Sequence, residues 1–283
     1  MKTAVVVFTK VPKAGDTKTR LSIDRGGIFT LEEAASFYRA SLLDVLDSCI
    51  EADCADLYIC QNLNGDQKVM EELVQETSNP QAIKEIFKDK GGHFDEGMQY
   101  AIDYILKGGG EDRLADSVII VGGDNPVLQP DTLREAVKKL EKLASSKEAK
   151  ECALKYKEFE IEPEIGAAMI ESIDQEGGFN LIGYTYSTPF SFEGVFYNLD
   201  GVTALDMIAR KAGERNIPIS IVEMVPDVDL PIDLANFLPA LNTLELAAKY
   251  DKDVVLPKRT AKFLKDLDLE TTATAEFYGI LRE

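Results

Sequence analysis

The sequence predicts an α/β domain with a largely parallel sheet, and three observations lead to this fold class. Short apolar runs typical of buried strands alternate with longer stretches in which apolar residues recur at helical spacing. The chain has 283 residues, and 45% of them are hydrophobic, which is enough to form one large core. No internal repeat or low-complexity linker interrupts the pattern. In folds of this kind, ligands bind beyond the carboxyl ends of the strands.

The first half of the chain has the clearest signals. Residues 3–9 are a continuous Val-rich run typical of a buried strand. A helix is expected from Thr30 to about Ile50, because Thr30 and Glu33 have capping-box spacing. Pro130 is well placed to open another helix. The elements expected in this half are strands at 3–9, 56–60, 83–87 (a short strand or loop) and 117–121, and helices at 30–50, 66–76, 95–106 and 130–145.

In the second half, residues 145–164 are charged and lose their periodicity, so we expect a surface excursion there. The elements expected after this excursion are strands at 165–172, 179–184 and 217–225, and helices at 199–215, 232–250 and in the tail after Pro257.

Composition excludes several classes of function. The net charge of −19 argues against general binding to nucleic acid or to a membrane surface. The single histidine, His93, argues against a Ser-His-Asp or Cys-His nucleophile. The four cysteines form no CxxC pair, and together with the single histidine this argues against a zinc cage. No run is long enough for a signal peptide or a membrane span, so we expect a cytoplasmic protein in a reducing compartment.

The first 25 residues differ from this acidic background, because they hold six basic and only two acidic residues. Gly15 would let the backbone approach a phosphate, while Lys18 and Arg20 would supply charge-assisted hydrogen bonds. The segment does not match a nucleotide-binding P-loop, since the glycine before the lysine is missing. A phosphate site and a solvated basic loop both remain possible on composition.

Two acidic segments also follow predicted strands. Asp124 comes after a buried strand and two glycines, where it is either a ligand for Mg²⁺ or Mn²⁺ or an ordinary turn residue. Near Pro231, Asp227 or Asp229 could be a second metal ligand, whereas Asp233 could cap the following helix. Together, two acidic strand ends and one basic loop describe a transferase that acts on a nucleotide, with the cation bridging carboxylates and a diphosphate.

These motifs, in this order, resemble the GT-A-type nucleotide-diphospho-sugar transferase superfamily. Within it, the chain is most similar to a family of small bacterial and archaeal glycosyltransferase-like proteins. The family pattern FxKxPxxGxxKTRL is matched at residues 8–21 by FTKVPKAGDTKTRL, and GxDxP at residues 122–126 by GGDNP. The patterns DGGYYLIG and DxDxxEDL are matched at residues 176–183 by EGGFNLIG and at residues 227–234 by DVDLPIDL.

The resemblance implies a three-layer, Rossmann-like GT-A fold with a mainly parallel mixed sheet. It covers roughly residues 1–240, which would form the nucleotide-binding transferase domain, with residues 241–283 as a helical extension packed on it. It also implies a role for each matching residue. The implied roles are nucleotide binding by Lys10, Gly15, Lys18, Arg20 and Gly123, metal binding by Asp124 and Asp229, catalysis by Lys18, Arg20, Asp124 and Glu176, and an acceptor-facing position for Glu176, Gly177 and Gly178.

The chain departs from the family pattern at three places. Glu176 stands where aspartate is usual, and Ile232 replaces an acidic residue. The family segment GDLGxRM corresponds at residues 92–98 to GHFDEGM, in which Gly97 replaces an arginine.

Three functions are consistent with this sequence. The first is glycosyl transfer from a nucleotide-diphospho-sugar to a small-molecule acceptor with Mg²⁺ or Mn²⁺, for which Glu176 or Glu193 could be the base. The second is nucleotidyl transfer from a nucleoside triphosphate to a phosphorylated acceptor, with release of pyrophosphate and no need for a base. The third is an inactive homologue that binds a nucleotide or a protein partner. The oligomeric state is left open.

Overall fold

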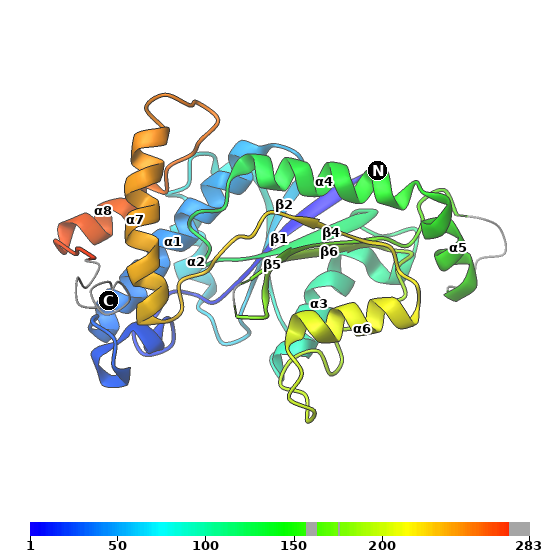
Figure 1. The fold of residues 1–283 in the computed structure, drawn as a ribbon, viewed down its shortest axis with the longest axis horizontal. Helices are drawn as coiled ribbons and strands as arrows, with labels where there is room; N and C mark the ends of the chain where they lie inside the picture. Colours follow the sequence, from blue (N-terminus) through cyan, green and yellow to red (C-terminus); the bar gives the residue numbers. More distant parts are fainter. Residues whose placement is uncertain (157–162, 175, 272–283) are drawn as a thin grey trace, which may run out of the picture.

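In the computed structural model, residues 1–156, 163–174 and 176–271 are described, and they form a three-layer α/β fold (Figure 1). The sheet has seven strands in the order β3-β2-β1-β4-β6-β5-β7, and every pairing is parallel except those of β6 with β4 and β5. The strands are β1 (Thr3–Thr9), β2 (Asp56–Gln61), β3 (Ile83–Lys88), β4 (Ser117–Gly122), β5 (Met169–Ile173), β6 (Phe179–Thr185) and β7 (Ile219–Val222). The predicted fold class, α/β with a mainly parallel mixed sheet, is confirmed.

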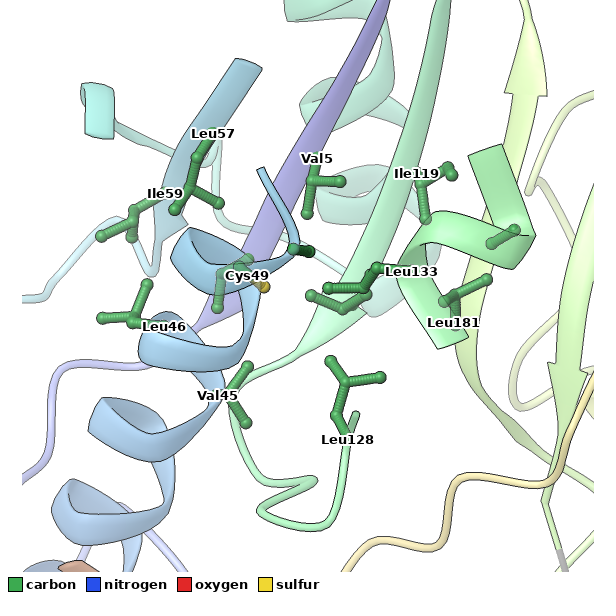
Figure 2. Packing of buried hydrophobic residues seen from close by; sticks show 14 of the residues in the cluster. Val5, Val45, Leu46, Cys49, Leu57, Ile59, Ile119, Leu128, Leu133 and Leu181 are labelled. Atoms are coloured by element: carbon green, nitrogen blue, oxygen red, sulfur yellow. The ribbon is translucent and has the colours of Figure 1, made fainter. Parts of the chain in front are cut away.

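Helices cover both faces of this sheet, because successive strand residues point to opposite sides. Val5 and Val7 of β1 pack beneath α1 and α4, whereas Ala4 and Val6 pack against α3 and α6. Figure 2 shows the first of these cores, where Ile59 of β2 lies on the side of Leu46 from α1 and Ile119 of β4 lies on the side of Leu133 from α4. The helices are α1 (Leu31–Ala52), α2 (Gln67–Val74), α3 (Phe94–Leu106), α4 (Pro130–Ala144), α5 (Lys147–Tyr156), α6 (Ala204–Glu214), α7 (Pro231–Ala247) and α8 (Lys258–Asp266).

Most of the predicted elements are confirmed within a few residues. Thr30 caps α1 with the predicted capping box: its side chain accepts a hydrogen bond from the Glu33 amide, and its own amide donates to the Glu33 carboxylate. The helix predicted from residue 199 begins later, at Ala204, because the Thr203 side chain caps it by accepting a hydrogen bond from the Asp206 amide.

The surface excursion predicted for residues 145–164 is wrong for its first half, where the chain forms α5. Ala149, Cys152 and Ala153 are buried along one stripe of this helix. These side chains are small and lie among charged neighbours, so they give little hydrophobic contrast in the sequence. Residues 157–162 of the same prediction lie outside the described part of the chain.

The last helices pack against the beginning of the chain. Leu241 of α7 and Leu264 of α8 join a buried cluster with Leu21, with Phe29 just before α1 and with Phe37 within α1. The predicted domain boundary at residue 240 falls within α7, which runs from Pro231 to Ala247. Figure 1 shows α7 and α8 at one end of the sheet, next to the segment that follows β1. None of the helices among the described residues is long and apolar enough to cross a bilayer.

Replacing Asp44 by Ala is expected to destabilise the protein by about 2 kcal/mol. The buried Asp44 carboxylate accepts hydrogen bonds from the amides of Arg259 (3.1 Å) and Thr260 (2.8 Å) at the start of α8, and the variant leaves these donors without a partner. Thermal and urea unfolding measure the loss. Lys262→Ala, which breaks only the exposed pair of Lys262 with Asp266, should change the stability by less than about 0.5 kcal/mol. Equal effects of the two variants would contradict this account.

Candidate functional site

The carboxyl ends of β1, β4, β5 and β7 meet along one edge of the sheet, and a cavity of about 680 Å³ opens there. Its lining includes residues from the loops after β1, β4 and β7, which are the three loops predicted to carry the chemistry. Asp124 follows β4, and Asp227 and Asp229 follow β7. Lys10, Lys18 and Arg20 come from the loop after β1.

The three aspartates converge in this cavity. One carboxylate oxygen from each of Asp124, Asp227 and Asp229 lies within 4.8 Å of the other two. Two oxygen ligands of one Mg²⁺ lie at most about 4.2 Å apart, since each is about 2.1 Å from the ion. The aspartates therefore need only a small adjustment to surround one ion, and carboxylate oxygens are the donors that Mg²⁺ and Mn²⁺ prefer.

Local structure explains why these carboxylates point into the cavity. Val228 is 1% exposed and packs into the cluster formed by α7 and the start of α1, so the flanking Asp227 and Asp229 face the other way. The Asp233 carboxylate accepts hydrogen bonds from the amides of Asp229 (3.1 Å) and Leu230 (2.7 Å), which fixes this loop. The predicted capping role of Asp233 at the start of α7 is therefore confirmed.

The glycines before Asp124 make room for it. A Cβ atom at Gly122 would lie 2.7 Å from the Asp124 carboxylate, and one at Gly123 would lie 2.6 Å from the Thr9 hydroxyl. Gly123 thus allows close packing of β4 on β1 and does not itself line the cavity. Gly15 adopts φ +80° in an exposed turn and does not line the cavity either.

Lys18 lies between the carboxylates. Its ammonium nitrogen is 2.8 Å from Asp124 Oδ2 and also forms an ion pair with Asp229, and its side chain is only 3% exposed. Arg20 approaches Asp229 from the exposed side, with 3.5 Å between its guanidinium and the carboxylate. The Lys18 ammonium thus occupies the place where a divalent cation held by these aspartates would lie.

The loop that carries Lys18 is built to hold this position. Lys18 itself has a left-handed backbone (φ 49°), which is uncommon for a residue with a side chain. Before it, the buried Thr17 hydroxyl donates to the Lys13 carbonyl, and after it Leu21 is fully buried in the cluster with Phe29. Lys10, at the start of the loop, donates its amide to the Tyr38 hydroxyl (3.1 Å).

The charges in the cavity shift the ionisation of their neighbours. Burial alone would lower the pKa of Lys18, but the carboxylates of Asp124, Asp229 and Asp227 outweigh it and raise that pKa above its usual value. Burial, together with the Asp124 charge, raises the pKa of Asp227 to about 8. Burial would also raise the pKa of Asp229, but the Lys18 ammonium overcomes it and the pKa is lowered.

Glu176, the predicted acceptor-side residue, is exposed and does not line the cavity. Its pKa is raised, first by partial burial and then by the charges of Asp233 and Asp174. Glu193 is also exposed and lies outside the lining. Asp174 does line the cavity, and sequence reasoning missed it although it directly follows β5, as Asp124 follows β4.

The GHFDEGM segment lies at the start of α3, where Gly92, His93, Phe94, Gly97 and Met98 line the cavity. Gly97 is buried against Phe8, and a Cβ atom there would lie 3.2 Å from the Phe8 ring. Further aromatic side chains line the same side, and sequence reasoning assigned none of them a role in the site. They are Phe8, Phe94, Phe179, Phe196 and Tyr197.

Comparison with solved structures supports the fold. A protein from Desulfovibrio desulfuricans described as a "putative nucleotide-diphospho-sugar transferase" superposes with a TM-score of 0.66 at 18% identity, over 94% of this chain and 97% of that one. A 4-diphosphocytidyl-2C-methyl-D-erythritol synthase from Anaerococcus prevotii gives 0.47 at 9% identity, over 85% and 99% of the two chains. At 18% identity the likeness to the Desulfovibrio protein concerns the fold alone, and the second likeness, with a TM-score under 0.5, adds no support.

Sequence comparison identifies a family. No curated protein matches the chain at a significant level. The model of one protein family matches residues 45–199, which is more than half of the chain and includes β2 to β6 with the Asp124 loop. The chain therefore belongs to the family described as "Uncharacterized protein conserved in bacteria (DUF2064)".

Proposed function

We propose that this protein is a divalent-cation-dependent transferase that uses a nucleotide-activated donor, and that the donor is a nucleotide-diphospho-sugar. The observation that carries the proposal is the convergence of Asp124, Asp227 and Asp229 with Lys18 and Arg20 in one cavity. The name of the Desulfovibrio structure agrees with this reaction class.

The donor diphosphate would lie against Lys10, Lys18 and Arg20, which offer the charge-assisted donors that phosphate oxygens require. Asp124 and Asp229, with Asp227 beside them, would hold Mg²⁺ or Mn²⁺. The bound cation would neutralise the charge that develops on the departing phosphate. The protein's own contribution is to hold the diphosphate in one orientation and to supply positive charge at fixed positions.

Glycosyl transfer also requires a group that takes the proton of the acceptor hydroxyl. Glu176 remains a candidate near the cavity, but Asp174 lines the cavity itself. We propose Asp174 as the base. Asp174→Asn is expected to lower kcat about 100-fold with little change in nucleotide affinity, whereas Glu176→Gln should lower it less than about threefold. Steady-state kinetics of both variants test this, and the opposite ranking would transfer the role to Glu176.

Product analysis separates the two transfer reactions. Glycosyl transfer releases a nucleoside diphosphate from a nucleotide sugar, whereas nucleotidyl transfer releases pyrophosphate from a nucleoside triphosphate. Incubation of the protein with Mn²⁺, an acceptor mixture and each donor, followed by phosphorus NMR, is expected to show the diphosphate. Pyrophosphate as the product would replace this proposal by the alternative. Nucleotide binding without turnover of either donor would favour the inactive homologue, and absence of nucleotide binding by thermal shift would contradict the proposal.

We also propose that residues 1–240 form the transferase unit and that the predicted extension, residues 241–283, packs on it through residues 241–271. Residues 272–283 of this prediction lie outside the described part of the chain. The burial of Leu241 and Leu264 against the start of α1 supports this arrangement. Cys49, Cys54, Cys60 and Cys152 are free thiols, which supports a reducing, cytoplasmic location.

A further inference from the structure

The cavity has two chemically different halves. All the lysines and arginines that line it among the described residues, namely Lys10, Lys18 and Arg20, come from the loop after β1. Five aromatic side chains form a second part of the lining, which we call the aromatic wall. The aromatic wall consists of Phe8, Phe94, Phe179, Phe196 and Tyr197.

The four phenylalanine rings of the aromatic wall contact one another in a chain. The Phe94 ring stands perpendicular to that of Phe196, with 4.6 Å between centroids, and contacts Phe8 edge-on at 5.7 Å. Phe179 extends the set, with its ring 5.5 Å from that of Phe196. Phe94 is 45% exposed and Tyr197 is 91% exposed. Large apolar surfaces left open inside a cavity are typical of ligand-binding sites.

The position of the wall is fixed by a specific contact. Both carboxylate oxygens of Asp95, the second residue of α3, accept hydrogen bonds from the segment that follows β6. Their donors are the amides of Gly194 (2.8 Å) and Phe196 (3.0 Å). Asp95 thus holds Phe196 beside Phe94 and fixes the segment that leads into Tyr197. Tyr197 keeps a left-handed backbone (φ 51°), an uncommon conformation for a bulky residue.

Charge indicates what this half of the cavity binds. Apart from the aromatic rings and the three aspartates of the proposed cation site (Asp124, Asp227 and Asp229), the lining outside the loop after β1 contains the carboxylates of Asp89 and Asp174 and the imidazole of His93. The donor diphosphate would bind all three basic side chains of that loop. A second phosphate, on the acceptor, would then lie near carboxylates, which repel it. No lysine or arginine of the described lining would be left to bind it.

We propose that the aromatic wall binds the acceptor, and that this acceptor is an uncharged hydroxyl compound with a ring that packs against Phe94 and Phe196. This inference rests on the proposed glycosyl transfer and adds the class of the acceptor. The acceptor oxygen bonds to the anomeric carbon of the donor sugar while the bond from that carbon to the phosphate oxygen breaks. The nucleoside diphosphate leaves with the electron pair of that bond, and the hydroxyl proton passes to the Asp174 carboxylate.

Binding measurements test the inference without turnover. The probes are phenyl glucoside, which is uncharged and has an aromatic ring, and glucose phosphate, which carries the charge that the acceptor half should exclude. Saturation-transfer NMR on the full-length protein is expected to show contact with the phenyl protons of the first probe. An excess of glucose phosphate should not displace it.

Three variants locate the site. Phe94→Ala and Tyr197→Ala should each weaken phenyl glucoside binding about three- to tenfold and leave the affinity for a nucleoside diphosphate unchanged. Tyr197 is exposed, so its replacement does not disturb the core. Tyr250→Ala is the matched control, because Tyr250 is also exposed (85%) but lies outside the cavity lining, and it should change neither affinity.

Three outcomes would overturn the inference. They are failure of phenyl glucoside to bind, competition by glucose phosphate at the same site, and equal binding by the wall variants and the wild type. If Phe94→Ala instead weakens binding of the nucleoside diphosphate, the aromatic wall binds the nucleobase and the inference is also wrong. These outcomes differ from the one that would contradict the proposed function itself. In that case the nucleoside diphosphate would not bind to the wild type.

Discussion

Asp124→Asn is expected to weaken Mn²⁺ binding at least 100-fold and to lower the rate of transfer about 1000-fold. The variant keeps the size of the side chain but removes the negative charge of Asp124 from the three aspartates around the proposed cation, together with a carboxylate partner of Lys18. Loss of an outer partner of a metal ligand already costs about 10- to 100-fold in affinity, and loss of one group that stabilises developing charge costs about 100- to 1000-fold in rate. Isothermal titration with Mn²⁺ and single-turnover kinetics measure the two effects.

The control for this variant is Asp131→Asn on α4. Asp131 is exposed and pairs only locally, with Arg134, so its replacement should leave metal binding and turnover unchanged. Circular dichroism verifies that both variants are folded. Normal Mn²⁺ binding by a folded Asp124→Asn protein would exclude Asp124 as a ligand.

Lys18→Met is expected to have opposite effects on the two ligands. The variant removes a charge-assisted donor to the diphosphate, so nucleotide affinity should fall about 10- to 100-fold and turnover about 1000-fold. Affinity for Mn²⁺ in the absence of nucleotide should rise, because the ammonium that lies between Asp124 and Asp229 is gone. Methionine keeps the length of the buried stem, so the fold of the loop is preserved.

Lys13→Met provides the comparison for Lys18. Lys13 belongs to the same basic loop, but it is exposed (72%), pairs with Asp16 and does not line the cavity. Its replacement should leave both affinities within about twofold of the wild-type values. If Lys18→Met binds Mn²⁺ more weakly than the wild type, the ammonium does not compete with the cation, and its position among the carboxylates has another cause.

Much of the arrangement of the site can be predicted from the sequence, because its charged residues follow the ends of predicted strands. Asp124 and Asp229 lie far apart in the chain, yet both follow parallel strands and therefore meet at one edge of the sheet. The basic residues after β1 reach the same edge for the same reason. The alternation of apolar runs and helical periods located nearly every strand and helix of the described residues.

Other features depend on side-chain directions that a single sequence does not contain. The orientation of both Asp227 and Asp229 follows from the burial of Val228 between them. The aromatic wall draws rings from separate segments, and no spacing in the sequence shows that these rings meet in one cavity. Glu176 was chosen by motif, whereas Asp174, two residues earlier, lines the cavity.

The central claim is that Asp124 and its neighbours hold a cation that helps to bind a nucleotide diphosphate. Equilibrium dialysis of a nucleoside diphosphate against the wild type and Asp124→Asn, each with and without Mn²⁺, tests it most directly. Mn²⁺ is predicted to raise the nucleotide affinity of the wild type at least tenfold and to leave that of Asp124→Asn nearly unchanged. The same gain in both proteins, or no gain in the wild type, would contradict the claim.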